Sequence, residues 1–306
     1  MHRVAVLVAI VLALAMATGA DGEPTTVAKI PVPAGAQPCA AAGAGRFVWV
    51  SMFGAPYLLR IDPRRNVVAG RARVGNGACG LGAGAGSLWV EDTYSSTVSR
   101  VSIRTGKRVA AIDVGGTPYD ATFAYGAAWV TAWGADELVR IDPATNRLTA
   151  HVPLDKATGV VGAFGSIWAT GTEGVIRVDP KTGAVVARIS LPMAGWTAGG
   201  KDAVWVTTPT GLSRIDPVTN AVSASVAIPG PVGDPAVVAG QVWVPRVRAG
   251  RIAVVDPASK TVVETVRVGA GPFVVTEIGG EAWVPSWRGR DVWRVRPKPG
   301  PAFPSG

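Results

Sequence analysis

Seven tryptophans recur along this chain at nearly even intervals, and this spacing constrains the fold more than any other feature. They are Trp49, Trp89, Trp129, Trp168, Trp205, Trp243 and Trp283. The intervals between neighbours are 40, 40, 39, 37, 38 and 40 residues. A period near 40 residues is typical of a propeller blade with four short antiparallel strands. We therefore predict an all-β chain that forms one seven-bladed β-propeller.

Each unit has the same order of segments. In the third unit, small residues at 119–124 precede a glycine turn and a strand that carries Trp129. A third strand ends at Ile141, and residues 142–146 (Asp-Pro-Ala-Thr-Asn) form a turn before the outermost strand. Proline fixes φ and the aspartate carboxylate accepts backbone N–H groups, so this sequence favours a tight turn. Small residues suit a crowded innermost strand, whereas Trp and Val suit a strand buried on both faces.

The two ends of the repeat region complement each other. No fourth strand follows Arg296, while a strand at 26–32 precedes the first unit without a partner. We expect the early strand to be the outer strand of the last blade, because closing the ring removes exposed sheet edges. The predicted propeller spans residues 26–297, and a flexible tail is expected at 298–306.

Residues 1–20 have the features of a secretory signal peptide. His2 and Arg3 precede an apolar run at 4–17, and small residues that fit a cleavage site follow. The run is too short for an ordinary transmembrane span, although an uncleaved N-terminal anchor is the alternative. A short linker is expected at 21–25. We therefore expect a secreted or extracytoplasmic protein of the cell envelope, with no integral membrane segment after signal removal.

The blade sequence contains Gly86-Ser87-Leu88-Trp89-Val90, a variable loop, and a stretch that continues to Thr117-Pro118. It resembles the YVTN-type β-propeller repeat over nearly all of the mature chain. This resemblance implies an extracytoplasmic protein of a group that binds varied partners, including surface-layer and single-stranded-DNA binders. The repeat is also similar to that of the streptogramin (virginiamycin B) lyases, which implies a metal-assisted carbon–oxygen lyase that uses histidine and carboxylate chemistry.

Histidine is nearly absent from the chain. His2 lies in the signal segment, and His151 is expected at the start of an outer strand, away from the axis. A general acid–base role therefore has no obvious candidate, so we assign no catalytic residue and favour a non-enzyme. Acidic residues are expected at the top face, where the loops from second to third strands and the loops entering the innermost strands open. They are solvated loop acids or a weak divalent-metal site near the axis: Glu91, Asp92, Asp120, Asp136, Glu137 and Asp234. No other cofactor is expected.

Aromatic and arginine side chains are also predicted to gather at this face. The aromatic candidates are Phe53, Tyr119, Trp133, Trp196, Phe273 and Trp287. The arginine candidates are Arg246, Arg248, Arg288 and Arg290. Such a set suits stacking on rings combined with contacts to anionic groups, although local loop packing is the alternative.

The formal net charge is +9, and residues 241–300 hold ten Lys or Arg against five Asp or Glu. A basic surface attracts polyanions, unless the excess of arginine reflects composition alone. We predict a monomeric binding propeller for an anionic or aromatic ligand. Its expected partner is a wall polymer, single-stranded nucleic acid or another protein, and a metal-assisted lyase is the alternative.

The two cysteines occupy the same position in adjacent repeats. Cys39 and Cys79 each lie ten residues before their repeat tryptophan, at the expected top of an innermost strand. Neighbouring inner strands converge toward the axis, which can bring the sulfur atoms within bonding range. An oxidising location favours the bond. The pair forms a disulfide, or else both remain buried thiols.

Overall fold

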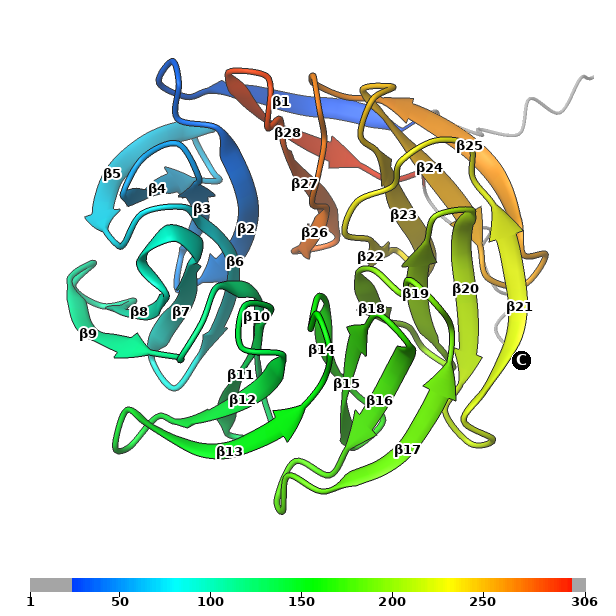
Figure 1. Cartoon of the computed structure of the whole chain (residues 1–306). Coiled ribbons are helices and arrows are strands. Elements are labelled where there is room, and N and C mark those ends of the chain that lie inside the picture. The colour runs from blue at the N-terminus through cyan, green and yellow to red at the C-terminus, as the bar shows by residue number, and fades with distance from the viewer. Residues whose placement is uncertain (1–23, 299–306) are drawn as a thin grey trace, which may run out of the picture.

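The computed structural model describes residues 24–298, which form seven four-stranded antiparallel sheets arranged around a central axis (Figure 1). This arrangement is the predicted seven-bladed propeller. The predicted signal peptide at 1–20 and most of the predicted tail lie outside the described residues. Within the described range, no helix is long and apolar enough to cross a membrane.

The strands of each blade follow the chain from the axis outward. In blades 1 to 4 they are β2 (Pro38–Ala44), β3 (Phe47–Met52), β4 (Tyr57–Asp62) and β5 (Val67–Arg73); β6 (Ala78–Gly84), β7 (Ser87–Asp92), β8 (Thr97–Ser102) and β9 (Arg108–Asp113); β10 (Pro118–Ala124), β11 (Ala127–Ala132), β12 (Glu137–Asp142) and β13 (Arg147–Pro153); and β14 (Val160–Ala163), β15 (Ser166–Gly171), β16 (Gly174–Val178) and β17 (Val185–Ser190). In blades 5 to 7 they are β18 (Thr197–Gly199), β19 (Val204–Thr208), β20 (Gly211–Asp216) and β21 (Ala221–Ala227); β22 (Ala236–Val238), β23 (Gln241–Arg246), β24 (Arg251–Asp256) and β25 (Thr261–Arg267); and β26 (Thr276–Ile278), β27 (Glu281–Pro285), β28 (Asp291–Arg296) and β1 (Thr25–Pro31). A single turn of 3₁₀-helix, η1 (Thr93–Ser95), joins β7 to β8.

The seven repeat tryptophans lie in the second strands, and all are buried to at least 99%. They pack between neighbouring sheets, as the apolar cluster of Trp49, Leu58, Leu88 and Val90 from blades 1 and 2 illustrates. The innermost strands are crowded. A Cβ atom on Gly82 would lie 2.6 Å from the backbone nitrogen of Phe123 in the next blade, so only glycine fits there. The small-residue pattern at the axis therefore follows from the closeness of the blades.

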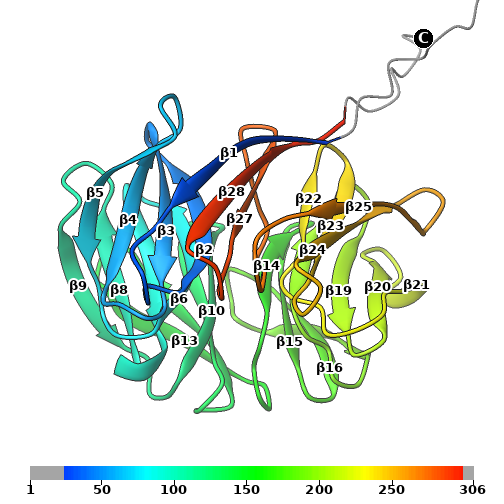
Figure 2. The same cartoon turned by 90° about the horizontal axis from the view of Figure 1, so that it is seen from above.

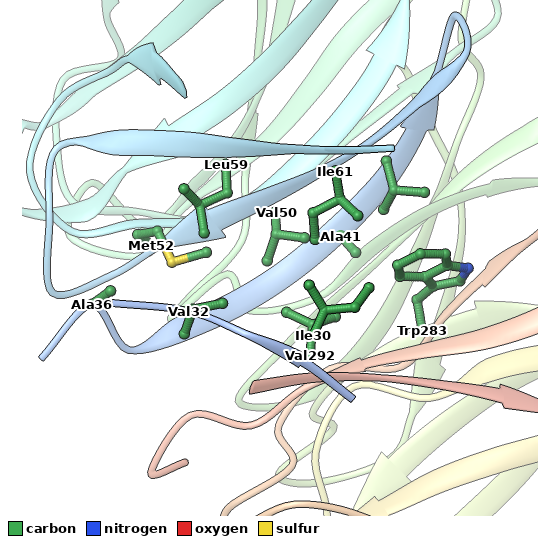
Figure 3. Close-up of a cluster of buried hydrophobic side chains, with 11 residues drawn as sticks. Ile30, Val32, Ala36, Ala41, Val50, Met52, Leu59, Ile61, Trp283 and Val292 are labelled. Atoms are coloured by element: carbon green, nitrogen blue, oxygen red, sulfur yellow. The ribbon is translucent and has the colours of Figure 1, made fainter. Parts of the chain in front are cut away.

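The last blade contains both ends of the described chain. Strand β1 pairs antiparallel with β28, with Ile30 opposite Val292, and the two strands lie side by side in Figures 1 and 2. Ile30 is 1% exposed and packs in a cluster that also contains Val50, Ile61 and Trp283 (Figure 3). The prediction that an N-terminal strand closes the ring is confirmed, and its side chains join blade 7 to blade 1.

Arginines in three third strands reach the outer turn of the next blade. Arg100, Arg177 and Arg294 each donate through Nη1 to a proline carbonyl and to an asparagine side chain of that turn. The asparagines are Asn146, Asn220 and Asn66, respectively, and all three have positive φ. These contacts join blade 2 to 3, blade 4 to 5, and blade 7 to 1.

A second set of inter-blade contacts lies near the axis. Two residues after the repeat tryptophan, the hydroxyls of Ser51 and Thr131 donate to carbonyls of the next blade, Cys79 O at 2.6 Å and Thr158 O at 2.8 Å. Thr170 makes the equivalent bond to Gly195 O. Blade 2 has Glu91 at this position instead. A carboxylate therefore replaces a structural hydroxyl at one point of the ring.

Candidate ligand-binding site

The top face carries a continuous arc of aromatic rings. In order the rings are Tyr94, Phe53, Trp287, Phe273, Trp196, Tyr119 and Trp133, hereafter the aromatic arc. Consecutive ring centroids lie 5.0, 4.5, 5.9, 5.1, 5.3 and 6.4 Å apart. These distances match those of interacting aromatic pairs. The rings come from blades 1, 2, 3, 5 and 7, so loops far apart in the sequence build one surface.

A cavity of about 500 Å³, hereafter the outer cavity, opens beside this arc. It is lined by Phe53, Cys79, Glu91, Thr93, Tyr94, Tyr119, Trp196, Val247, Gly271, Phe273, Trp287 and Arg288. Its walls are therefore mainly aromatic, with one arginine and one buried glutamate. Binding cavities for small molecules have this composition: apolar walls with a few placed polar groups.

The four predicted arginines do not share one place. Arg288 lines the outer cavity, whereas Arg246 and Arg248 line a separate hollow of about 340 Å³ beside Pro229 and Pro231. Arg290 is exposed and lines neither. Of the predicted aromatics, Trp133 extends the arc but lies outside the cavity lining, with Lys156 over its ring at 4.6 Å. The outer cavity is thus lined by five of the six predicted aromatics and by one of the four predicted arginines.

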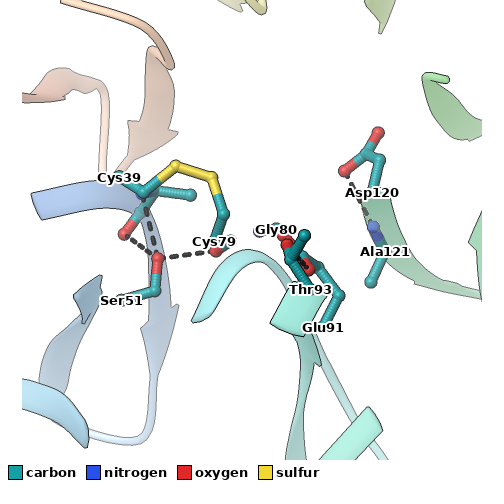
Figure 4. The surroundings of a disulfide bond; sticks show 9 residues. Cys39, Ser51, Cys79, Gly80, Glu91, Thr93, Asp120 and Ala121 are labelled. Carbon is teal, nitrogen blue, oxygen red and sulfur yellow. Dashed lines mark hydrogen bonds between the residues drawn. A yellow bond between two sulfur atoms is a disulfide. The ribbon is translucent and has the colours of Figure 1, made fainter. Parts of the chain in front are cut away.

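Cys39 and Cys79 form a disulfide between the innermost strands of blades 1 and 2, with their Cα atoms 5.1 Å apart (Figure 4). The disulfide packs with Phe53, Phe273 and Trp287 in one apolar cluster. It therefore connects the two blades and forms part of the wall beneath the aromatic arc.

Glu91 lies beneath the outer cavity and is 1% exposed. Its Oε1 accepts the Gly80 N–H at 2.8 Å, and its Oε2 accepts the Thr93 hydroxyl at 2.8 Å (Figure 4). Burial raises the pKa of Glu91 well above its ordinary value, and these hydrogen bonds oppose the rise only in part. Nearby Asp120 and Asp92 raise it further by repulsion. Glu91 therefore has a strong tendency to be neutral.

Two further carboxyl groups lie closer to the axis. Burial raises the pKa of Asp120 to about 6, although its oxygens accept the N–H groups of Val160 and Ala121 at 2.8 Å each. Burial also raises the pKa of Asp234 well above its ordinary value, and repulsion from Asp120 adds to this. Strongly shifted carboxyl groups are typical of functional clefts, although structural networks produce them as well.

The remaining described histidine lies apart from the buried carboxyl groups. His151 lies on the outer strand β13, where Nδ1 is 2.8 Å from Glu137 Oε2, and it is exposed. Across the described part of the chain, no three His, Cys, Asp or Glu side chains are grouped so that they could hold a metal ion.

Sequence reasoning missed several lining residues. Tyr94 lies five residues after Trp89, one position later than the aromatics in the equivalent loops, and it belongs to the turn of 3₁₀-helix η1. Thr93, Val247 and Gly271 also line the cavity without an unusual sequence signal. Only the equivalence of the loops between second and third strands could have revealed Tyr94.

Residues 58–198, from β4 of blade 1 to β18 of blade 5, match a family described as a repeat of unknown function (DUF6923). A comparison with curated protein sequences found no significant match.

Solved structures with similar folds include three different proteins from three organisms. The β-propeller domain of Cps50 (Swd1) from Myceliophteria thermophila has a TM-score of 0.75 and 11% identity, over 89% of this chain and 99% of that one. A catalytically inactive virginiamycin B lyase from Staphylococcus aureus, solved with quinupristin, has a TM-score of 0.74 and 14% identity, over 88% and 98%. Hydrazine synthase from Kuenenia stuttgartiensis has a TM-score of 0.74 and 16% identity, over 87% and 97%. At these identities the likeness concerns the propeller fold alone.

Proposed function

We propose that this chain is a non-catalytic, extracytoplasmic binding propeller whose outer cavity holds a flat, ring-bearing anion. The ring of the ligand stacks on the aromatic arc, and its anionic group pairs with Arg288. A nucleobase with its phosphate, free or at the end of a single strand, has this chemistry. The proposal also includes the extracytoplasmic location, which the sequence at 1–20 and the disulfide favour.

The juxtaposition of Trp287 and Arg288 carries this proposal. Trp287 stands between Phe53 and Phe273 in the aromatic arc, at 4.5 and 5.9 Å. Arg288 is exposed, and among residues 24–298 its guanidinium has no hydrogen bond or ion pair. An arginine without a protein partner beside stacked rings supplies a free fork of N–H donors for phosphate or carboxylate.

The size of the cavity favours one unit of ligand over a long polymer tract. A volume of about 500 Å³ lies within the range of small-molecule sites. Arg246, Arg248 and Arg290 lie away from the cavity, so they offer no continuous basic track along the rings. We therefore expect binding to depend on Arg288 and to fall only moderately with added salt.

Calorimetric titration with adenosine monophosphate and with a short oligothymidylate tests this function. We expect Arg288→Ala to weaken both by at least about tenfold, the loss typical of a charge-assisted contact. Trp287→Ala should weaken both through lost stacking. Arg290→Ala is the matched control because it removes the same charge two residues away, outside the cavity.

Equal weakening by Arg288→Ala and Arg290→Ala would show general charge attraction and overturn the site. The absence of binding to both probes at low salt would overturn the ligand class. Tighter binding of the oligothymidylate would identify single-stranded nucleic acid as the ligand. Equal binding of the two probes would identify a free nucleotide.

A further inference from the structure

A second cavity lies along the axis beneath the aromatic arc. It has a volume of about 280 Å³ and is lined mainly by the innermost strands of the blades; we call it the axial channel. Cys79, Tyr119, Trp196 and Phe273 line both this channel and the outer cavity. These residues therefore form a partition between the two cavities.

The ionisable lining of the axial channel is acidic, although the chain has a net charge of +9. Asp120, Asp234 and Glu277 line it, and no Lys, Arg or His is among its lining residues. Asp120 accepts two backbone N–H groups, while in the described chain the Asp234 carboxylate has no hydrogen-bond partner. The channel thus contains negative charge density that the protein itself leaves without a cation.

A buried hydroxyl in the channel wall also lacks a partner. Thr197 lines the channel and is 6% exposed, and its Oγ1 has no hydrogen-bond partner. By contrast, the hydroxyls of Ser51, Thr131 and Thr170 all donate to carbonyls of the next blade. A buried hydroxyl without a partner is rare and destabilises the folded state. The Thr197 oxygen is itself enclosed, so replacement by valine should stabilise the channel wall without removing a contact to a molecule in the channel.

We propose that the axial channel binds a small organic cation, a protonated alkylamine, beneath the aromatic partition. The ammonium group donates hydrogen bonds to the carboxylates of Asp234 and Asp120. The rings of Tyr119, Trp196 and Phe273 cover its alkyl part through apolar contact. The cation offsets the repulsion between the two aspartates.

The arrangement suits an ammonium group better than a metal ion. The two aspartates come from blades 3 and 6, and no metal-ligating trio of side chains occurs within residues 24–298. A divalent ion needs several oxygens that converge on one point. Separate N–H donors can reach acceptors on different strands. The volume of about 280 Å³ is large enough to hold a small alkylamine.

The test compares n-butylamine with 1-butanol, its neutral counterpart, by calorimetric titration at pH 8. We expect butylamine to bind and butanol to bind at least about tenfold more weakly, since the charge supplies the difference. Asp234→Asn should weaken butylamine by at least about tenfold. Thr197→Val removes only the enclosed unpaired hydroxyl, so it should raise the melting temperature and leave butylamine binding within about twofold. A loss of binding in Thr197→Val as large as that in Asp234→Asn would overturn the placement of the ammonium group at the aspartates.

Arg288→Ala should leave butylamine binding within twofold, and Asp234→Asn should leave nucleotide binding intact. This pair of variants separates the channel from the outer cavity, so either site can fail alone. Equal binding of butylamine and butanol, or unchanged butylamine binding in Asp234→Asn, would overturn the proposal. Binding of Mg²⁺ without binding of the amine would also overturn it.

Discussion

Arg294 in β28 and Asn66 in the turn after β4 lie 228 residues apart in the chain, and Arg294 Nη1 donates to Asn66 Oδ1 at 3.0 Å. The same nitrogen donates to the Pro63 carbonyl. The guanidinium also forms an ion pair with buried Glu281 in β27. One arginine therefore connects the last blade to the first at the outer rim of the ring.

Loss of the asparagine should weaken this closure. Asn66 has φ of 54°, so Asn66→Gly keeps the turn conformation while it removes one charge-assisted bond. We expect a loss of about 1–2 kcal/mol in the free energy of unfolding, measured by denaturant titration. Lys260→Gly is the matched control, since Lys260 has φ of 58° in the equivalent turn and makes no bond to another blade there. Equal effects of the two substitutions would contradict a role for the inter-blade bond.

Packing of the closing strand should matter more than its outer polar contacts. Ile30 is 1% exposed between blades 7 and 1, and Ile30→Ala leaves a cavity there. We expect a loss of about 3 kcal/mol in the free energy of unfolding. Thr26→Ala, at an exposed position of the same strand, should change it by less than about 0.5 kcal/mol. A small effect of Ile30→Ala would show that the ring does not depend on this strand.

The disulfide should stabilise the ring by lowering the conformational entropy of the unfolded chain. Cys39 and Cys79 enclose a loop of 40 residues, for which chain entropy gives about 4 kcal/mol. We expect replacement of both cysteines by serine to lower the free energy of unfolding by up to this amount. Thiol titration of the unreduced, denatured wild-type protein should detect no free thiol, and detection of two would contradict the bond.

The channel acids should make stability depend on pH in an unusual direction. Burial and repulsion from Asp120 raise the pKa of Asp234, so its contribution to stability is present below about pH 4 and is lost as the pH rises through its folded-state pKa. We expect Asp234→Asn to raise the melting temperature at pH 8 by roughly 3 °C or more, and to change it little at pH 4. Asp155→Asn, at an exposed site, controls for net charge and should show no such trend. A constant difference across pH would contradict the channel electrostatics.

The repeat could be predicted because every blade has the same packing and turn requirements. Trp129 must be buried between sheets and Asp142 must cap its turn, so both recur at fixed spacing; Asp142 Oδ1 accepts the Ala144 N–H at 2.9 Å, as expected. The closing strand could be predicted from two features of the sequence. The last blade has no outer strand after Arg296, and the strand expected at 26–32 belongs to no other blade.

The site could be predicted only in part, because it consists of departures from the repeat. The aromatics at equivalent loop positions, such as Phe53 and Trp287, were visible by comparison of blades. The separation of Arg246 from Arg288 depends on loop paths across the face, which repeat spacing does not determine. The unpaired Thr197 hydroxyl depends on distances between blades and has no sequence signal.

The joins between blades are unequal. In the described range, no hydrogen bond, ion pair or disulfide crosses from blade 5 to blade 6, where Trp205 meets Val242, Val244 and Val255 through apolar packing alone. Apolar contact is non-directional, so these two sheets can slide on each other without breaking a directional bond. We therefore expect the elastic compliance of the ring to be greatest at this join. We expect small changes in the bore of the axial channel to occur there first.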